Sequence, residues 1–246
     1  MSASLFAPPP QAAQALPAGE QELKFHVPRH RSETLRRWLE ITLRPHPKFA
    51  VSTLCSLYFD TEENASLHEK TFSYYSKTKY RLRWYEDGRG NPLPVPAFIE
   101  IKAKQGAVRH KYRSPLPVSA RELCDTPLDA PLFESLFRSH CPREGWLPCA
   151  PLKPVLELRY QRNRYEHPLF PEAFCLDSHI RCTRTNLALL PPAQNVELTH
   201  DVFEQKGGST DLVPVLRALP RFGAQRASIS KYFLTVMQLL PDDFHA

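Results

Sequence analysis

Charged side chains occupy every second position in several strand-like segments of this chain. The remaining positions of these segments are mostly apolar, β-branched or aromatic; the segments are ELK at 22–24, RLR at 81–83, EIKAK at 100–104, RHKYR at 109–113 and EQK at 204–206. Successive residues of a β-strand point to opposite faces of a sheet, so each segment directs its charges to one face and its other side chains to the opposite face. The pattern therefore predicts a sheet protein with one strongly charged face.

A solvated outer face would explain the alternation in any single segment, because antiparallel sheets commonly expose one polar face. These faces, however, are dense in Arg and Lys, and like charges opposite one another on neighbouring strands destabilise a sheet. If the sheet closes into a barrel with its charges inward, the interior is a basic channel with a few carboxylates. A polyanion with a divalent metal would give both the basic groups and the carboxylates partners of opposite charge. Guanidinium and ammonium groups bind phosphate, and carboxylates bind magnesium or manganese.

The length and charge of the chain set broad limits on its organisation and partners. Its 246 residues suffice for one large domain, and its net charge of +6 permits an anionic partner. Residues 1–19 are rich in Ala, Pro and Gln and have no periodicity, so we expect a disordered N-terminal extension. We expect residues 20–246 to form the domain.

Several kinds of site and location are disfavoured. No apolar stretch approaches the roughly 20 residues of a membrane span, and the N-terminus lacks the features of a signal peptide, so we expect a cytoplasmic protein. Neither GxGxxG nor GxxxxGK followed by Ser or Thr occurs, so phosphate binding must come from side chains. The cysteines show no zinc-like spacing. No nucleic-acid partner is expected, because we find no helix-turn-helix and no exposed aromatic platform.

Periodicity and turn signals predict an α+β protein built on an antiparallel, eight-stranded β barrel or tunnel with flanking helices. The expected strands are 21–27, 53–60, 78–86, 97–104, 107–113, 154–166, 173–184 and 196–206. The expected helices lie within 31–41, 62–75, 131–139, 211–219 and 229–240.

Eight short motifs appear in the order found in the vacuolar transporter chaperone (VTC) domain. They are ELK at 22–24, SLYFDT at 56–61, RLRWY at 81–85, EIKAK at 100–104, KYR at 111–113, YQR at 160–162, FEQK at 203–206 and SKY at 230–232. The chain resembles the bacterial stand-alone members of this family over almost its whole length after Gln21. The family belongs to the CYTH-like triphosphate tunnel metalloenzymes, and the resemblance implies their charged, eight-stranded tunnel.

The resemblance implies a metal-dependent polyphosphate polymerase that transfers the terminal phosphate of ATP to a growing inorganic polyphosphate chain and releases ADP. Two alternatives stay open: a triphosphatase of the same superfamily, and a non-catalytic protein that binds polyphosphate or nucleotide. Relatives in membrane complexes have partner segments that cross the bilayer; this sequence contains none, so we expect that any export of the product requires a membrane-protein partner.

The resemblance also implies a set of site residues. The expected catalytic residues are Lys24, Arg81, Arg83, Lys102, Lys111, Arg162 and Glu204. The expected substrate-binding residues are Lys104, Arg113, Lys206, Arg226, Ser230 and Lys231. Glu204, with Glu22 and Glu100, would hold Mn²⁺ or Mg²⁺.

Two features depart from the family pattern. The family usually has an RxTxD element in the strand after YxR, but this chain has Ala173 at the position of its arginine. The role of that arginine is lost unless Arg181 or Arg184 substitutes for it. In addition, Glu157 and Arg159 are out of phase with Arg162 on an ideal strand, which predicts either a β-bulge or only one set of inward-facing charges.

Overall fold

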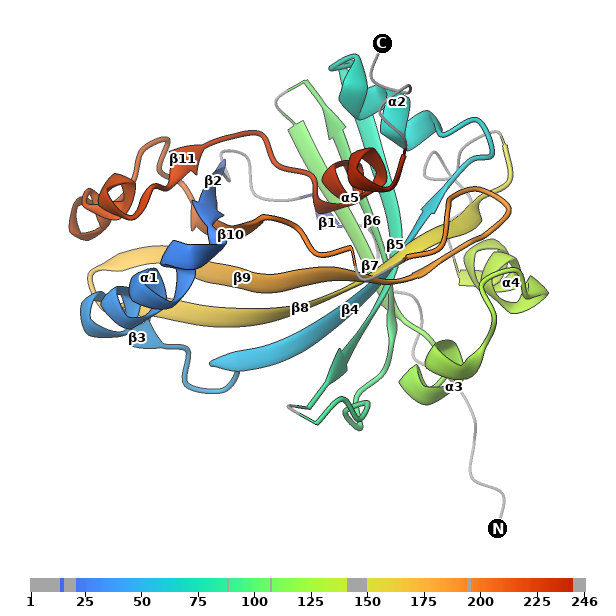
Figure 1. The fold of residues 1–246 in the computed structure, drawn as a ribbon, viewed down its shortest axis with the longest axis horizontal. Helices are drawn as coiled ribbons and strands as arrows, with labels where there is room; N and C mark the ends of the chain where they lie inside the picture. Colours follow the sequence, from blue (N-terminus) through green and yellow to red (C-terminus); the bar gives the residue numbers. More distant parts are fainter. Residues whose placement is uncertain are drawn as a thin grey trace. The chain divides into compact units, whose positions relative to one another are not determined.

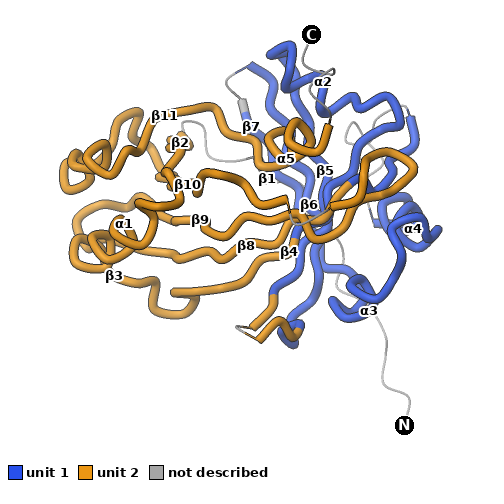
Figure 2. Tube along the Cα trace, viewed as in Figure 1, with its two compact units in different colours: residues 1–16, 56–85, 92–155 blue, residues 17–55, 86–91, 156–246 orange. Residues whose placement is uncertain are grey.

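The computed structural model describes residues 14–15, 21–87, 89–106, 108–140, 150–193 and 196–240. The chain divides into two compact units, shown in different colours in Figure 2. Unit 1 comprises residues 1–16, 56–85 and 92–155, and unit 2 comprises residues 17–55, 86–91 and 156–246. Strand β4 (Val51–Asp60) contributes to both units.

Unit 1 contains an antiparallel meander of three long strands. The strands β5 (Ser76–Glu86), β6 (Phe98–Gln105) and β7 (Val108–Pro115) pair in sequence order, and the short β1 (Gln14–Ala15) pairs with β7. Apolar residues of β5 and β6, such as Leu82 and Ile101, are fully buried, while charged residues alternate with them on the opposite face.

The described part of unit 1 contains three helices: α2 (Ala65–Thr71), α3 (Ala120–Asp125) and α4 (Pro131–His140). The carboxylate of Asp60, at the end of β4, accepts hydrogen bonds from the backbone N–H groups of Ser66 and Leu67 in the first turn of α2. Helix α4 buries an apolar stripe that includes Phe137, whose ring centroid lies 4.4 Å from that of Phe59. Capping by Asp60 thus stabilises the start of α2, and apolar packing stabilises α4.

Unit 2 continues the strand order from β4 through β8 (Lys153–His167), β9 (Phe170–Thr185), β10 (His200–Gly207), β2 (Gln21–Pro28) and β11 (Gln225–Arg226). The two-residue β3 (Arg44–Pro45) lies beside β8. The long β8 and β9 run side by side in Figure 1. These strands carry most of the charged motifs of the second half of the chain.

One face of the unit 2 sheet is covered by α1 (Arg29–Thr42) and by two short 3-10 helices, η1 (Pro214–Leu216) and η2 (Leu219–Phe222). Leu35 and Leu39 of α1 are fully buried in a core with Leu23 and Phe25 of β2. Full burial of each such side chain contributes about 1.5–3 kcal/mol. This core fixes which face of β2 is apolar, and it leaves Glu22 and Lys24 on the other face.

Several expectations about the fold need correction. Among the described residues the strand order has two ends, β1 and β11, so the sheet they form is not closed, and it holds ten strands in this order with β3 alongside, not eight. Strands of two residues are too short to show alternation, which is why the sequence did not reveal them. The helix expected over 211–219 is instead replaced by η1 and η2, each with a proline in its first turn.

The N-terminal extension is described only at Gln14–Ala15, which pair with β7; the rest of residues 1–19 lies outside the described residues. The C-terminal helix is confirmed as α5 (Lys231–Leu239). No helix in the described part of the chain is long and apolar enough to span a bilayer.

Candidate functional site

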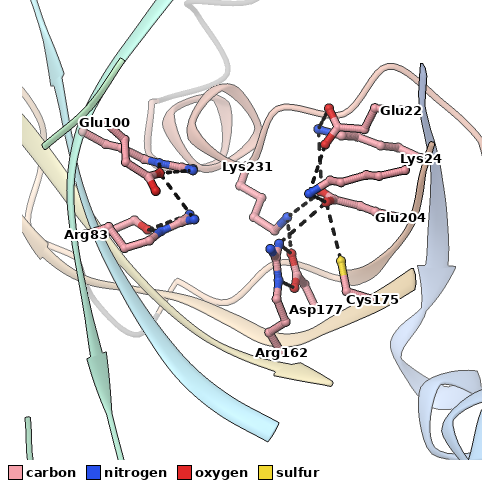
Figure 3. Close-up of polar contacts among 12 residues, drawn as sticks. Glu22, Lys24, Arg83, Glu100, Arg162, Cys175, Asp177, Glu204 and Lys231 are labelled. Atoms are coloured by element: carbon pink, nitrogen blue, oxygen red, sulfur yellow. Dashed lines mark hydrogen bonds and ion pairs between the residues drawn. The ribbon is translucent and has the colours of Figure 1, made fainter. Parts of the chain in front are cut away.

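Three strands of unit 2 bring charged side chains into one row. In the strand register Glu204 of β10 lies opposite Lys24 of β2 on one side and Cys175 of β9 on the other, while Lys206 lies opposite Glu22. Directly opposed residues share a face of the sheet. The ELK and FEQK motifs therefore meet through strand pairing, and Figure 3 shows the side chains of Glu22, Lys24 and Glu204 near one another.

Glu204 is the centre of this row. Its side chain is 4% exposed and forms ion pairs with Lys206 at 3.0 Å, Lys231 at 3.5 Å, and Lys24 and Arg162 at 3.6 Å. Burial raises the pKa of Glu204, but the surrounding positive charges outweigh burial and hold the pKa well below its ordinary value. Glu204 is thus ionised at neutral pH.

Asp177 of β9 lies fully buried beside Glu204 and binds two cations. Its two carboxylate oxygens accept hydrogen bonds from Arg162 at 2.5 and 2.6 Å, and the ammonium group of Lys231 lies 2.6 Å away. Burial raises the pKa of Asp177, but Arg162 and Lys231 outweigh it and lower the pKa from 3.8 to about 2. The same pairing raises the pKa of Lys231 despite its burial, so both groups stay charged.

The ring of Tyr160 completes the surroundings of these two cations. Its centroid lies 5.2 Å from the Lys231 ammonium nitrogen and 5.7 Å from the Arg162 guanidinium carbon, which is within cation–π range. Lys231 is the first residue of α5, and Ser230 caps that helix by accepting a hydrogen bond from the backbone N–H of Phe233. Ser230, expected to bind substrate, thus caps the helix that begins at Lys231, and its role in binding stays a prediction.

Unit 1 carries a second set of charges in three rows across β5, β6 and β7, which we call the cation ladder. Directly opposed residues form the rows Lys77–Lys104–Arg109, Lys79–Lys102–Lys111 and Arg81–Glu100–Arg113. Eight of these nine residues are cations. Like charges opposite one another disfavour pairing of the strands, and an anion that spans more than one row would suit these guanidinium and ammonium groups.

Glu100 is the one carboxylate of the cation ladder. Its side chain is 2% exposed and pairs with Arg81 at 2.5 Å and with Arg83 and Arg113 at 3.4 Å. Burial raises the pKa of Glu100, but Arg83 and Arg81 lower it well below its ordinary value. Burial also lowers the pKa of Lys111, against the opposing effect of Glu100. Glu100 orients the arginines of this ladder.

Divalent metal binding was expected at Glu204, Glu22 and Glu100. Glu22 and Glu204 lie diagonally across the β2–β10 pair, and Lys206 contacts both, at 3.4 and 3.0 Å. Within the described residues no group of three or more His, Cys, Asp or Glu side chains could hold a metal by itself. The donor set fits an ion such as Mg²⁺, which is often held by one or two carboxylates and completed by substrate phosphates. Glu100 belongs to the other unit, where its contacts are arginines.

Arg226 is not brought to the charged row. In β11 it lies opposite Phe25, whose side chain belongs to the core face of β2, so Arg226 shares that face and not the face of Lys24. There it lines a hollow of about 390 Å³ with Leu212 and Arg217. Arg226, which was expected to bind substrate, therefore lies apart from Lys24, and its role in binding stays a prediction.

The missing arginine of the RxTxD element is not replaced by its neighbours. Ala173 is exposed and lies opposite Lys206. Arg184 pairs with Glu157 at 2.5 Å, and Arg181 lies opposite Arg159 at the other end of β9. The structure therefore has no arginine at the exposed position opposite Lys206.

The phase change along β8 had two explanations, a β-bulge or charges of which only one set faces inward; the extra residues at the register shifts lie on β9, so no bulge in β8 re-aims its side chains. The pairing of β8 with β9 shifts register between Arg159 and Gln161. Arg159 pairs with Glu86 at 2.5 Å, whereas Arg162 pairs with Asp177. The two halves of β8 therefore serve different ion pairs.

Several charged residues of these two sets were not among the expected site residues. Asp177 was noticed only as the end of the incomplete RxTxD element, and its clamp on Arg162 depends on the shifted register of β8 and β9. Lys77, Lys79 and Arg109 belong to the cation ladder. The alternation in KTKYRLR at 77–83 was the signal that could have identified the two lysines.

The model of the VTC domain family matches residues 19–240. No curated protein sequence matches the chain. Among solved structures, a protein of Pyrococcus horikoshii OT3 is 12% identical, with a TM-score of 0.50 over 89% of this chain and 98% of that chain. This likeness concerns the fold alone.

Two further structures are similar at lower scores. A candidate adenylate cyclase of Bacillus halodurans is 16% identical, with a TM-score of 0.49 over 86% of this chain and 95% of that chain. A candidate adenylyl cyclase of Hippeastrum, described as having a dominant triphosphatase activity, is 15% identical, with a TM-score of 0.47 over 91% of this chain and 98% of that chain.

Proposed function

The chain belongs to the VTC domain family, and from this premise we propose that it is a metal-dependent polyphosphate polymerase. In this proposal it transfers the terminal phosphate of ATP to the end of an inorganic polyphosphate chain and releases ADP. ATP and polyphosphate are its partners, and Mn²⁺ or Mg²⁺ is its cofactor. We also propose that it acts in the cytoplasm.

The observation that carries the proposal is the excess of paired and opposed cations on both units. Eight cations and one carboxylate form the cation ladder of unit 1. In unit 2, Lys24, Lys206, Lys231 and Arg162 surround Glu204. A solvated surface gains nothing from like charges held opposite one another, whereas a phosphate chain brings a negative charge to each row.

Phosphoryl transfer suits this inventory because it needs little covalent help from the protein. The donor and acceptor must be held in line, and basic groups must stabilise the charge on the moving phosphoryl group. The nucleophile would be a terminal phosphate oxygen of the acceptor chain, so no serine or cysteine nucleophile is required. The proposed roles of the side chains are therefore binding, orientation and charge stabilisation.

Two kinds of cation would divide these roles in unit 2. Lys24 and Lys206 are partly exposed and pair with Glu22 and Glu204, so they can turn to incoming phosphate oxygens. Arg162 and Lys231 are held by the buried Asp177 and would present a fixed positive charge. A divalent ion held by Glu204 and Glu22 would supply neutralisation of the phosphate oxygens.

Ala173 favours a second candidate function. Where the family has an arginine, this chain offers only a methyl group beside Lys206. The loss of one phosphate ligand could leave a triphosphatase, which needs to hold only one phosphate substrate and water, or a protein that binds polyphosphate without turnover.

The test is incubation of the purified full chain with ATP and Mn²⁺, followed by assay of ADP, free phosphate and polymer on a gel. ADP together with polymer supports the polymerase, and free phosphate without polymer supports the triphosphatase. Lys24→Ala should remove the activity, whereas Lys48→Ala, a change at an exposed lysine of the same unit, should not. Binding of polyphosphate with no product would identify a binding protein.

A further inference from the structure

Three exposed aromatic side chains lie between α2 and β5 in unit 1. Phe72, Tyr74 and Tyr75 are 63%, 54% and 72% exposed. The rings of Phe72 and Tyr74 are stacked, with centroids 5.9 Å apart and planes at 25°, and the ring of His68 lies 5.9 Å from that of Phe72. We call Phe72 and Tyr74 the aromatic platform. Exposed aromatic groups of this kind commonly mark a binding surface.

The backbone holds the aromatic platform in place. The N–H groups of Phe72 and Tyr74 donate to the carbonyl oxygens of His68 and Glu69 in α2. Ser73, between the two aromatic residues, has a φ of 53°, in the left-handed region that a non-glycine residue seldom adopts. This turn lets both rings stack on the surface although only one residue separates them.

Tyr75 fixes the same segment to the end of the β6–β7 hairpin. Gly106 donates its backbone N–H to the carbonyl oxygen of Tyr75 at 3.0 Å. A Cβ atom at Gly106 would approach the Tyr75 side chain to 2.6 Å, so the glycine permits this ring to lie against the hairpin. The next residue, Ser76, begins β5 opposite Gln105. The aromatic platform is thus attached to the end of the sheet where the cation ladder begins.

The two all-cation rows of the ladder are close to this end. Lys77 and Lys79 lie one and three residues into β5, so at about 3.3 Å per residue their rows fall within about 10 Å of Ser76 along the strand. Lys104 and Lys102 lie opposite them on β6. Along the strand, this spacing is within the reach of a phosphate group joined by a short link to a ring on the platform.

We infer that Phe72 and Tyr74 form a nucleobase subsite, which binds the base of a nucleoside triphosphate whose phosphates lie on the lysine rows. This inference rests on the proposed function and adds the place and the chemistry of donor recognition. Inorganic polyphosphate has no group that gains from aromatic stacking, whereas every nucleobase has a π face. Phe72 and Tyr74 are exposed aromatic residues that were not among the expected site residues.

Stacking on two rings does not distinguish bases by hydrogen bonding. The side chain of Glu69, the nearest carboxylate of α2 to this segment in the sequence, already accepts a hydrogen bond from the N–H of Thr78. The subsite should therefore accept ATP and GTP with similar affinity, since recognition by stacking tolerates changes of base.

The experiment compares ATP with tripolyphosphate, which offers a similar phosphate chain without a base. Equilibrium binding of both is measured for the full chain and for the double variant Phe72→Ala with Tyr74→Ala. We expect affinity for ATP to fall about tenfold or more and affinity for tripolyphosphate to stay within about twofold. Tyr74→Phe keeps the ring and should bind ATP as the unaltered chain does. Leu169→Ala with Leu187→Ala, which removes exposed apolar side chains of unit 2, is the matched control.

Two results would overturn the subsite and leave the polymerase standing: an unchanged ATP affinity in the double variant, or an equal loss for both ligands, provided that polymer is still formed. A strong preference for ATP over GTP in the unaltered chain would contradict recognition by stacking alone. If the unaltered chain binds neither ATP nor tripolyphosphate, the proposed function fails as well. A melting temperature measured for each variant separates lost binding from lost folding.

Discussion

Asp177 binds Arg162 through both of its carboxylate oxygens while contacting Lys231 at 2.6 Å, and it does so in a place without solvent exposure. The carboxylate compensates the positive charges of Arg162 and Lys231, so both cations lose a counter-charge if Asp177 is neutralised. Removal of one partner from a buried ion pair is strongly destabilising, because the remaining charge stays buried without compensation.

Asp177→Asn should therefore lower the free energy of unfolding by about 3–5 kcal/mol and abolish polymer formation. Chemical denaturation of the ligand-free protein measures the first effect. Asp125→Asn is the control, since Asp125 forms an exposed ion pair with Arg121 in α3. Equal stabilities of the two variants would contradict the buried clamp.

Acid should weaken the fold through the same residue. The unfolded chain protonates Asp177 near pH 3.8, whereas the folded chain does so only near pH 2, so the unfolded state binds more protons between these values. This contribution to stability is complete above about pH 4 and is lost as the pH falls to 2; it amounts to about 2 kcal/mol. Unfolding free energies between pH 2 and 6 should show this slope, and Asp177→Asn should reduce it.

Glu204→Gln should separate metal dependence from anion binding. The change removes a negative charge that pairs with four cations, so the ligand-free protein should melt at a lower temperature. Metal-free binding of tripolyphosphate should be equal or tighter, because the row becomes more positive. Mn²⁺ should no longer increase turnover. Persistence of Mn²⁺-dependent turnover would mean that the metal is held elsewhere.

Ala173→Arg should restore the arginine that the family pattern contains. The position is exposed and lies beside Lys206, so the longer side chain has room to meet phosphate. We expect tripolyphosphate to bind about tenfold more tightly, the effect of one added hydrogen bond between charged groups. Ala173→Gln, which has a long but neutral side chain, is the control. Tighter binding by both variants would show that charge is not the cause.

The charged motifs could be predicted from the sequence because their period of two is incompatible with a helix. Lys24 and Glu204 were assigned to one site from the resemblance, and the structure places them opposite each other on β2 and β10. Arg162 and Lys231 also join that group.

The errors arose where the outcome depends on pairing between distant segments. The clamp between Asp177 and Arg162 follows a register shift that no local pattern encodes. The face that Arg226 occupies could not be predicted, because the orientation of a two-residue strand is set by its partner β2 and not by its own alternation. The expected eight-stranded closure failed for a similar reason, since β1 and β11 have no period of their own.

The cation ladder of unit 1 also bears on the lifetime of the protein in a cell. A bound polyanion would reduce the repulsion between these like charges, so β5, β6 and β7 should open locally less often when the ligand is present. Proteases act on such opened forms, and a ligand that binds only the folded state suppresses them. Empty molecules should therefore be degraded sooner than occupied ones, so that the abundance of the protein would follow the supply of its ligand without a dedicated regulator.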